Sequence, residues 1–237
     1  MNFGAILAGG KGTRMSISEL PKQFMMLGNK PIIIHTLEKI LLSYKIDVIY
    51  LGIHEDWMLY MEDLMKKYIN ITTTKEIHIV SGGKDRNETI MNIIKDIERK
   101  YPITEKDIIL THDAVRPFLN SRIIEENIDI MKECNACDTV ISSIDTIVVS
   151  ENGKTISDIP NRVKMYQGQT PQTFKVMKLK KLYYSLSEEE KNILTDACKI
   201  FYIRGEEVRL VTGDITNLKI TTPADYEIAQ SMIGGKN

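Results

Sequence analysis

Short runs of β-branched and aliphatic residues alternate along the chain with longer segments in which apolar residues recur every three or four positions. Such short runs are typical of strands buried on both faces of a sheet, and the longer period is typical of amphipathic helices. The expected strands are residues 3–7, 47–53, 76–80, 107–111 and 138–142, and the expected helices between them are 31–44, 57–68, 86–100 and 121–133. This order predicts an α/β fold with a doubly wound, mostly parallel, Rossmann-like sheet.

The pattern changes near residue 144. Two β-like runs surround the turn Glu-Asn-Gly-Lys, which predicts a hairpin that projects from the sheet as a β-arm at about residues 144–172. An arm of this kind often serves a partner subunit. Helices at 175–186, 195–203 and 223–233 and a strand at 207–213 are expected after it. Because no linker rich in Pro, Gly or Ser divides the chain, we expect a single domain over residues 1–237.

Composition narrows the function only by exclusion. The 237 residues carry a formal net charge of -1, which argues against a nucleic-acid partner. No apolar run approaches the roughly 18 residues of a membrane span, and the amino terminus lacks the features of a signal peptide. The three cysteines, Cys134, Cys137 and Cys198, are too few for a disulfide framework, and Cys134 and Cys137 lack a second pair at zinc-like spacing. We therefore expect a cytoplasmic protein without membrane insertion.

Glycines and basic residues follow the first strand in the stretch AGGKGTRM. Glycines let backbone amides approach an anion, and Lys11 and Arg14 add positive charge, so a phosphate is the expected ligand. A P-loop would need Gly at position 5 and Ser or Thr at position 12, where this chain has Ala5 and Gly12. A dinucleotide fingerprint starting at Gly10 fails at Met15. A glycine-rich turn without a ligand is the remaining alternative.

Three further segments place polar residues after strands, where parallel sheets bind ligands. The first holds a glycine pair followed by Arg86 and Thr89, and the second holds Asp113 and Arg116. The third is the loop with Asp214, Asn217 and Lys219. Each has a plain structural explanation as a turn, a cap or a local ion pair. Together they predict one ligand site, because all fall where the topology expects it.

The ordered motifs resemble the cytidylyltransferases that act on sugar-alcohol phosphates. They are A-G-G-x-G-x-R-M, L-P-K-Q-F, G-G-x-x-R-x-x-T, H-D-A-V-R-P, D-T, Q-T-P-Q-T-F, T-D-A and N-x-K-I-T-T-P-x-D, and they extend from Ala5 to Asp225. The resemblance implies a nucleotidyltransferase-type fold. Four segments are more similar to the branch that transfers CMP from CTP to D-ribitol 5-phosphate, giving CDP-ribitol and pyrophosphate. They are AGG at 8–10, RNETIMN, MYQGQTPQTF and LTDACKI. The alternative is the branch that uses 2-C-methyl-D-erythritol 4-phosphate in isoprenoid synthesis.

The resemblance also implies roles for individual residues. Catalytic roles fall to Arg14, Lys22 and Lys219. CTP binding is expected of Leu7, Ala8, Gly9, Gly10, Gly12, Thr13, Gly82, Gly83, Arg86, Thr89 and Asp113. Acceptor binding is expected of Asp113, Arg116, Thr146, Arg162 and Thr195, with Arg162 reaching across a homodimer formed through the β-arm. Mg²⁺ is expected to bind through CTP phosphates with no side-chain ligand assigned, a ribulose-5-phosphate reductase is a candidate partner, and teichoic acid or cell-surface polysaccharide synthesis is the implied pathway.

The chemistry of this reaction agrees with the residue types in the motifs. A phosphate monoester is already an anionic nucleophile near neutral pH, so no general base is needed. Two other classes are less well supported. A GT-A-type glycosyltransferase would require a D-x-D metal motif, whereas this chain has His-Asp-Ala-Val-Arg-Pro. A non-catalytic nucleotide sensor would not need cations placed for a leaving group, as Arg14, Lys22 and Lys219 are expected to be.

Overall fold

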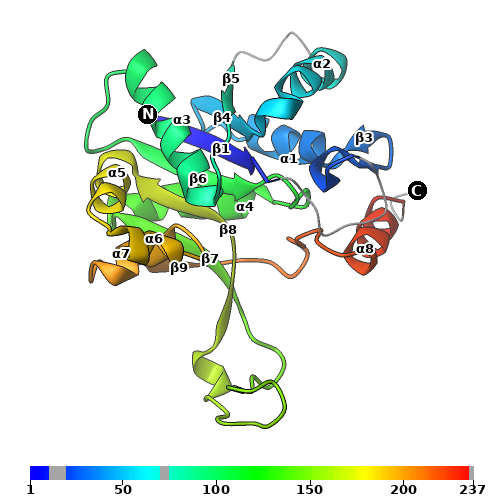
Figure 1. Cartoon of the computed structure of the whole chain (residues 1–237). Helices are drawn as coiled ribbons and strands as arrows, with labels where there is room; N and C mark the ends of the chain where they lie inside the picture. Colours follow the sequence, from blue (N-terminus) through cyan, green and yellow to red (C-terminus); the bar gives the residue numbers. More distant parts are fainter. Residues whose placement is uncertain (11–19, 70–74, 235–237) are drawn as a thin grey trace.

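The computed structural model describes residues 1–10, 20–69 and 75–234. Its centre is a seven-stranded sheet of order β5-β4-β1-β6-β8-β7-β9 (Figure 1). Neighbouring parallel strands form one half of this sheet, namely β5 (Glu76–Ser81), β4 (Val48–Ile53), β1 (Asn2–Ala8) and β6 (Ile108–Asp113). These four lie where the apolar runs predicted strands. The α/β class and the mostly parallel sheet are therefore confirmed.

The other half of the sheet contains an antiparallel strand that sequence reasoning missed. β8 (Tyr166–Lys175) lies between β6 and β7 (Ala136–Ser142) and is antiparallel to both, while β9 (Arg209–Thr212) is parallel to β7. The sequence prediction assigned residues 166–172 to the projecting arm, whereas the structure places them inside the sheet. The stretch is polar and contains Pro171, which is uncommon in a central strand. The pairing of β8 with β7 shifts register between Asp138 and Val140, opposite Gln169–Pro171, and such an irregularity accommodates a proline inside a sheet.

Helices cover both faces of the sheet (Figure 1). One face packs its alternate strand residues, such as Ile6 and Leu51, against α1 (Ile32–Leu41), α2 (Met58–Tyr68) and α4 (Ser121–Asp129). The opposite face packs Phe3 and Tyr50 against α3 (Arg86–Lys100), α5 (Val176–Tyr184) and α7 (Cys198–Ile203). The short α6 (Glu188–Asn192) joins α5 to α7. Two buried clusters thus sandwich the sheet, as a doubly wound fold requires.

A smaller cluster fixes the carboxyl-terminal helix. α8 (Pro223–Gly234) packs beside a two-stranded hairpin of β2 (Met26–Leu27) and β3 (Lys30–Pro31). The 3-10 helix η1 (Lys22–Phe24) directly precedes this hairpin. The hairpin and α8 therefore tie the end of the chain to the segment that follows its first strand.

Between β7 and β8 the chain extends away from the sheet as an arm, residues 143–165 (Figure 1). Its regular structure consists of one bridge, between Val149 and Asp158, and the 3-10 helix η4 (Arg162–Lys164). Exposed apolar side chains along it are Ile144, Val148, Val149, Ile156, Ile159 and Val163. An apolar surface of this kind on an extended segment is typical of an interface.

The three cysteines are free thiols. Burial raises the pKa of the Cys137 thiol to about 12, so this group is a protonated core side chain. Among the described residues, no cluster of three or more His, Cys, Asp or Glu side chains is arranged to hold a metal ion. Over the same residues, the helices are all too short or too polar to cross a membrane.

Candidate active site

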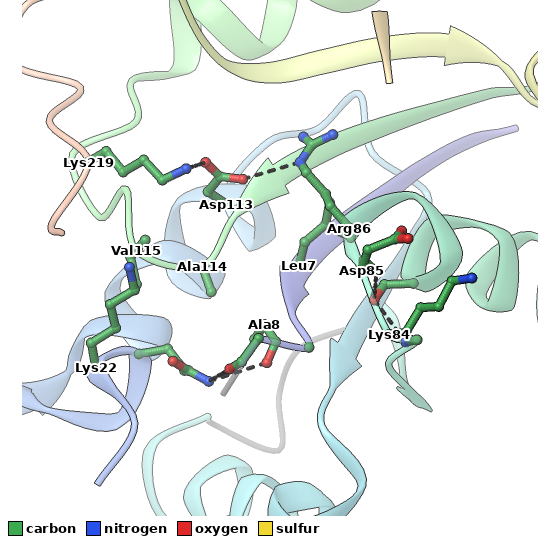
Figure 2. A pocket seen from close by; sticks show the side chains of 15 residues that line it. Leu7, Ala8, Lys22, Lys84, Asp85, Arg86, Asp113, Ala114, Val115 and Lys219 are labelled. Atoms are coloured by element: carbon green, nitrogen blue, oxygen red, sulfur yellow. Dashed lines mark hydrogen bonds and ion pairs between the residues drawn. The ribbon is translucent and has the colours of Figure 1, made fainter. Parts of the chain in front are cut away.

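A pocket of about 370 Å³ opens at the carboxyl ends of the central parallel strands (Figure 2). This is where an open α/β sheet binds its ligands. The lining residues are Leu7, Ala8, Gly9, Gly10, Lys22, Gln23, Gly83, Lys84, Asp85, Arg86, Thr89, Asp113, Ala114, Val115 and Lys219. Most residues predicted to bind CTP are among them. The predicted residues Gly12, Thr13 and Arg14 lie outside the described residues.

The first wall of the pocket depends on two glycines in contact. A Cβ atom on Gly82 would lie 2.8 Å from the Cα atom of Gly9, and a Cβ atom on Gly9 would lie 2.8 Å from the Thr89 hydroxyl oxygen. Real Cβ atoms do not come this close to other atoms, so another residue at Gly82 would force the ends of β1 and β5 apart, and another residue at Gly9 would displace the Thr89 side chain. The two glycine motifs, more than 70 residues apart in the sequence, therefore form one continuous backbone surface.

The start of α3 forms the second wall. Asp85 caps the helix, because its Oδ1 accepts a hydrogen bond of 2.8 Å from the Glu88 amide. The Thr89 hydroxyl accepts from the Gly83 amide at 2.9 Å and donates to the Asp85 carbonyl at 2.8 Å. Its only hydrogen is thus used inside the protein, and Thr89 shapes the turn at Gly83. A helix amino terminus at this position favours a bound anion.

The third wall comes from η1. The Gln23 side-chain amide donates to the carbonyls of Ala8 at 3.2 Å and Gly10 at 3.4 Å. These bonds hold η1 against the end of β1 and place Lys22 on the pocket wall. Sequence reasoning singled out Lys22 and missed Gln23, although the signal was present in the motif L-P-K-Q-F.

At the fourth wall, three cations surround the carboxylate of Asp113, a residue that is 8% exposed. Lys219 Nζ lies 2.9 Å from Oδ2, Arg116 Nε lies 3.7 Å from Oδ2, and Arg86 Nε lies 3.5 Å from Oδ1. Burial by itself would raise the pKa of Asp113, but the charges of Arg86, Lys219 and Arg116 hold it well below its ordinary value. The carboxylate is therefore ionised, and the cluster keeps an excess of positive charge that suits phosphate groups.

Behind Asp113 lies the fully buried His112. Its Nε2 is 3.1 Å from the Arg116 carbonyl, and its Nδ1 is 3.0 Å from the Thr170 hydroxyl. Because a carbonyl oxygen only accepts, Nε2 carries the proton, and the Thr170 hydroxyl donates to Nδ1. Burial lowers the pKa of His112 to about 4, so the ring is neutral near pH 7. His112 connects β6 to β8 and does not line the pocket.

Asn217 anchors the loop that carries Lys219. Its side-chain amide donates to the Thr170 carbonyl at 2.8 Å and to Gln169 Oε1 at 3.3 Å. Its carbonyl accepts from Arg116 Nη1 at 2.7 Å. Gln169 and Thr170 belong to the irregular part of β8, where side chains leave the regular ladder and bond to neighbouring segments. β8, which the sequence prediction missed, therefore holds the loop of Lys219 in place on this side of the site.

Three residues predicted to bind the acceptor lie away from this pocket. Thr146 and Arg162 are on the arm, where Arg162 Nη1 donates to the Ile144 carbonyl at 2.8 Å. Thr195 is exposed just before α7. None of the three lines the pocket within this chain. Arg116 does not line it either, but it contacts Asp113 and is largely buried.

Comparison with known sequences assigns the chain to one family. The family described as 2-C-methyl-D-erythritol 4-phosphate cytidylyltransferase (IspD) matches residues 4–235. Ribitol-5-phosphate cytidylyltransferases from two strains of Streptococcus pneumoniae are each 54% identical to this chain over 233 residues, which is 98% of this chain and 99% of the relative. Both comparisons extend over nearly the whole chain, so the similarity includes the pocket and the arm together.

Comparison with solved structures gives the same fold. The 4-diphosphocytidyl-2C-methyl-D-erythritol synthase of Anaerococcus prevotii superposes with a TM-score of 0.80 at 26% identity, with 98% of both chains covered. The 2-C-methyl-D-erythritol 4-phosphate cytidylyltransferase of Francisella tularensis has a TM-score of 0.75 at 23% identity and covers 97% of this chain. At this lower identity the likeness supports the fold alone.

Proposed function

The chain belongs to the 2-C-methyl-D-erythritol 4-phosphate cytidylyltransferase (IspD) family, and we propose that it transfers CMP from CTP to D-ribitol 5-phosphate, giving CDP-ribitol and pyrophosphate. The observation that carries the choice of acceptor is the 54% identity to ribitol-5-phosphate cytidylyltransferases over nearly the full length. The nucleotidyl-transfer chemistry has separate support from the pocket, whose walls combine glycine-rich backbone, a helix amino terminus and a cluster of cations.

The proposed reaction is a direct displacement at the α-phosphorus of CTP. A phosphate oxygen of the acceptor forms the new P–O bond, and the bond from the α-phosphorus to the bridging oxygen of pyrophosphate breaks. The acceptor phosphate is already anionic, so no side chain has to remove a proton. The protein therefore contributes by aligning two anions and by neutralising the charge that develops on the transferred and departing groups.

Lys22 and Lys219 are assigned to that neutralisation, together with Arg14, which lies outside the described residues. Lys22 and Lys219 come from separate walls of the same pocket (Figure 2). Asp113 holds the Lys219 ammonium at 2.9 Å and remains ionised, so its role is to orient cations. His112 is buried behind the pocket and takes no part in proton transfer.

Mg²⁺ fits the site through the nucleotide and not through a protein cage. Among the described residues, Asp113 and Asp85 are the carboxylates that line the pocket, and both are already engaged, Asp113 by cations and Asp85 as the cap of α3. We therefore assign most of the metal's ligands to phosphate oxygens of CTP and to water. When bound, the ion adds positive charge at the phosphates of CTP.

We propose that two chains form a homodimer through the arm. The arm exposes apolar side chains and makes one internal bridge, so burial against a second copy would remove its apolar surface from water. In such a dimer, the partner's Arg162 and the partner's Thr146 would complete the acceptor site. This arrangement accounts for the position of both residues outside the pocket of their own chain.

Pyrophosphate release by the purified protein, with CTP and Mg²⁺, tests the proposed function. We expect release with ribitol 5-phosphate and little with 2-C-methyl-D-erythritol 4-phosphate. Release with the erythritol compound alone would keep the chemistry and change the acceptor, an outcome favoured by the description of the matching family. Absence of release with either compound would contradict the proposed reaction for both acceptors.

A further inference from the structure

A polar row crosses the sheet from the edge of the pocket toward α7. Strand pairing places Thr111 of β6 opposite Gln172 of β8, and Gln172 opposite Asp138 of β7. Paired residues point to the same side of a sheet, and this side is the one covered by α3, α5 and α7. Arg86, which lines the pocket, begins the row by donating to the Thr111 hydroxyl at 3.4 Å.

Asp138 ends this row as a carboxyl group without an ion-pair partner among the described residues. Its Oδ1 accepts a hydrogen bond of 3.0 Å from the Gln172 side-chain amide. Burial raises the pKa of Asp138 to about 6, and the nearby charge of Asp196 acts in the same direction. A half-buried carboxyl without a cation costs stability, so packing alone does not account for an acid here.

The side-chain carbonyl of Gln172 gives a second sign that the row lacks a hydrogen-bond donor. Gln172 is 2% exposed, and its Oε1 has no hydrogen-bond partner in the part of the chain that the structure describes. Its amide nitrogen is fixed by Asp138, so the oxygen cannot exchange places with it without setting two acceptors against each other. Asp138 and Gln172 together therefore present acceptors in excess of donors.

The surroundings of Asp138 connect it to the proposed acceptor site. Cys198 at the start of α7 lies beside β7, with its Sγ 4.0 Å from the Cys137 carbonyl oxygen, so the preceding segment of Thr195 and Asp196 approaches Asp138. The charges of Asp196 and Arg86 both act on the pKa of Asp138. The middle of the row is buried, but Asp138 itself is partly exposed, and the exposed Gly168 of β8, which has no side chain, lies next to its Oδ2.

We propose that Asp138 determines acceptor specificity by accepting hydrogen bonds from hydroxyl groups of the polyol chain, with Gln172 fixing its orientation. This inference rests on the proposed function. Opposite charges lie near the two ends of the row: Arg86 begins it and surrounds Asp113 together with Arg116 and Lys219, whereas Asp138 ends it and is influenced by the charge of Asp196. A polyol phosphate therefore has one favourable direction, with its phosphate at the cations and its hydroxyl groups at Asp138.

Steady-state kinetics of Asp138→Asn test this role, because asparagine keeps the shape and removes the charge. We expect the KM for ribitol 5-phosphate to rise about 10- to 100-fold, as for the loss of a hydrogen bond to a charged group. The KM for CTP, and kcat at saturating acceptor, should stay within about twofold, because these depend on the other walls of the pocket. Asp63→Asn on α2 removes an exposed carboxylate elsewhere and should leave all three constants unchanged.

A shortened acceptor separates contact from a structural effect. With glycerol 3-phosphate, which lacks the hydroxyl groups farthest from the phosphate, Asp138→Asn and wild type should turn over within about twofold of each other. An equal loss with both acceptors, or a parallel rise in the KM for CTP, would overturn the assignment. Asp138→Glu, which keeps the charge and displaces it, should also raise the acceptor KM, and it provides the same comparison if the Asn variant fails to fold.

Wild-type activity separates a failure of the proposed function from a failure of the role assigned to Asp138. No pyrophosphate release by wild type with any polyol phosphate would overturn the proposed function and this inference together. Release by wild type with an unchanged acceptor KM in both Asp138 variants would overturn only the role of Asp138.

Discussion

The nucleotide side and the acceptor side of the site are built in different ways. On the nucleotide side, strand ends touch through Gly9 and Gly82, and hydrogen bonds of the Thr89 hydroxyl and the Gln23 side-chain amide to nearby backbone join the walls. On the acceptor side, Lys219 depends on contacts with distant segments, and the arm carries further residues away from the pocket. The walls of the proposed nucleotide cradle that the structure describes come from one chain, whereas the proposed acceptor half depends on long-range contacts and, we propose, on a second chain.

Lys219 lies where the two halves meet, so its removal should have the largest effect. We expect Lys219→Ala to lower kcat about 100- to 1,000-fold, the usual cost of losing one preorganised electrostatic group. The side chain is 45% exposed, so the variant should unfold at nearly the same temperature as wild type. Single-turnover rates with saturating CTP and acceptor measure the effect. Retention of full activity would remove Lys219 from the transition state.

His112 links β6 to β8 behind the pocket, and its titration should affect how the free energy of unfolding depends on pH. Burial lowers its pKa from an ordinary 6.5 to about 4, so between these values the unfolded chain binds a proton that the folded chain does not. The unfolding free energy should therefore fall by about 3 kcal/mol from this group as the pH falls from 6.5 to 4, and level off below.

Denaturant unfolding of wild type and His112→Gln across that pH range isolates the effect. The comparison is needed because Asp138, whose pKa is raised to about 6, acts in the opposite direction: the folded chain gains its proton first, which adds stability as the pH falls. We expect a shallower acid slope in the variant, since glutamine does not titrate. Identical slopes in both proteins would show that the pKa of His112 is not lowered in the folded state.

Asn217 tests whether the Lys219 loop needs its anchor. Asn217→Ala removes the bonds to Thr170 and Gln169, and we expect a loss of about 2 kcal/mol in stability and a roughly tenfold lower kcat, because Lys219 loses its fixed position. Ile215→Ala, on the same loop and 69% exposed, is the matched control and should change neither quantity by much. Equal effects of both substitutions would assign the loss to the loop in general.

The same contrast explains how much could be predicted from the sequence. The parallel strands and the nucleotide wall were predictable, because apolar runs mark buried strands and glycine-rich loops follow them directly. The anchoring roles of Gln23 and Asn217 and the central position of β8 were not. β8 lacks an apolar run, its Pro171 argues against a central strand, and its polar side chains are paired only by residues distant in the sequence.

Arg162 tests whether the acceptor half is shared between chains. Arg162→Ala should raise the acceptor KM about tenfold and leave the KM for CTP unchanged, because its charge would meet the acceptor phosphate and not the nucleotide. Lys164→Ala, in the same η4 segment, is the control for a general loss of positive charge on the arm. An unchanged acceptor KM in Arg162→Ala would separate the arm from the site.

Mixing two defective variants shows which chain supplies the residue. In a heterodimer of Arg162→Ala and Lys219→Ala, the chain with an intact Lys219 would receive an intact Arg162 from its partner, so one of the two sites would be complete. At subsaturating acceptor, random exchange of subunits should therefore restore about a quarter of wild-type activity. If Arg162 acted on the pocket of its own chain, each site in the heterodimer would lack one of the two residues, and mixing would restore nothing.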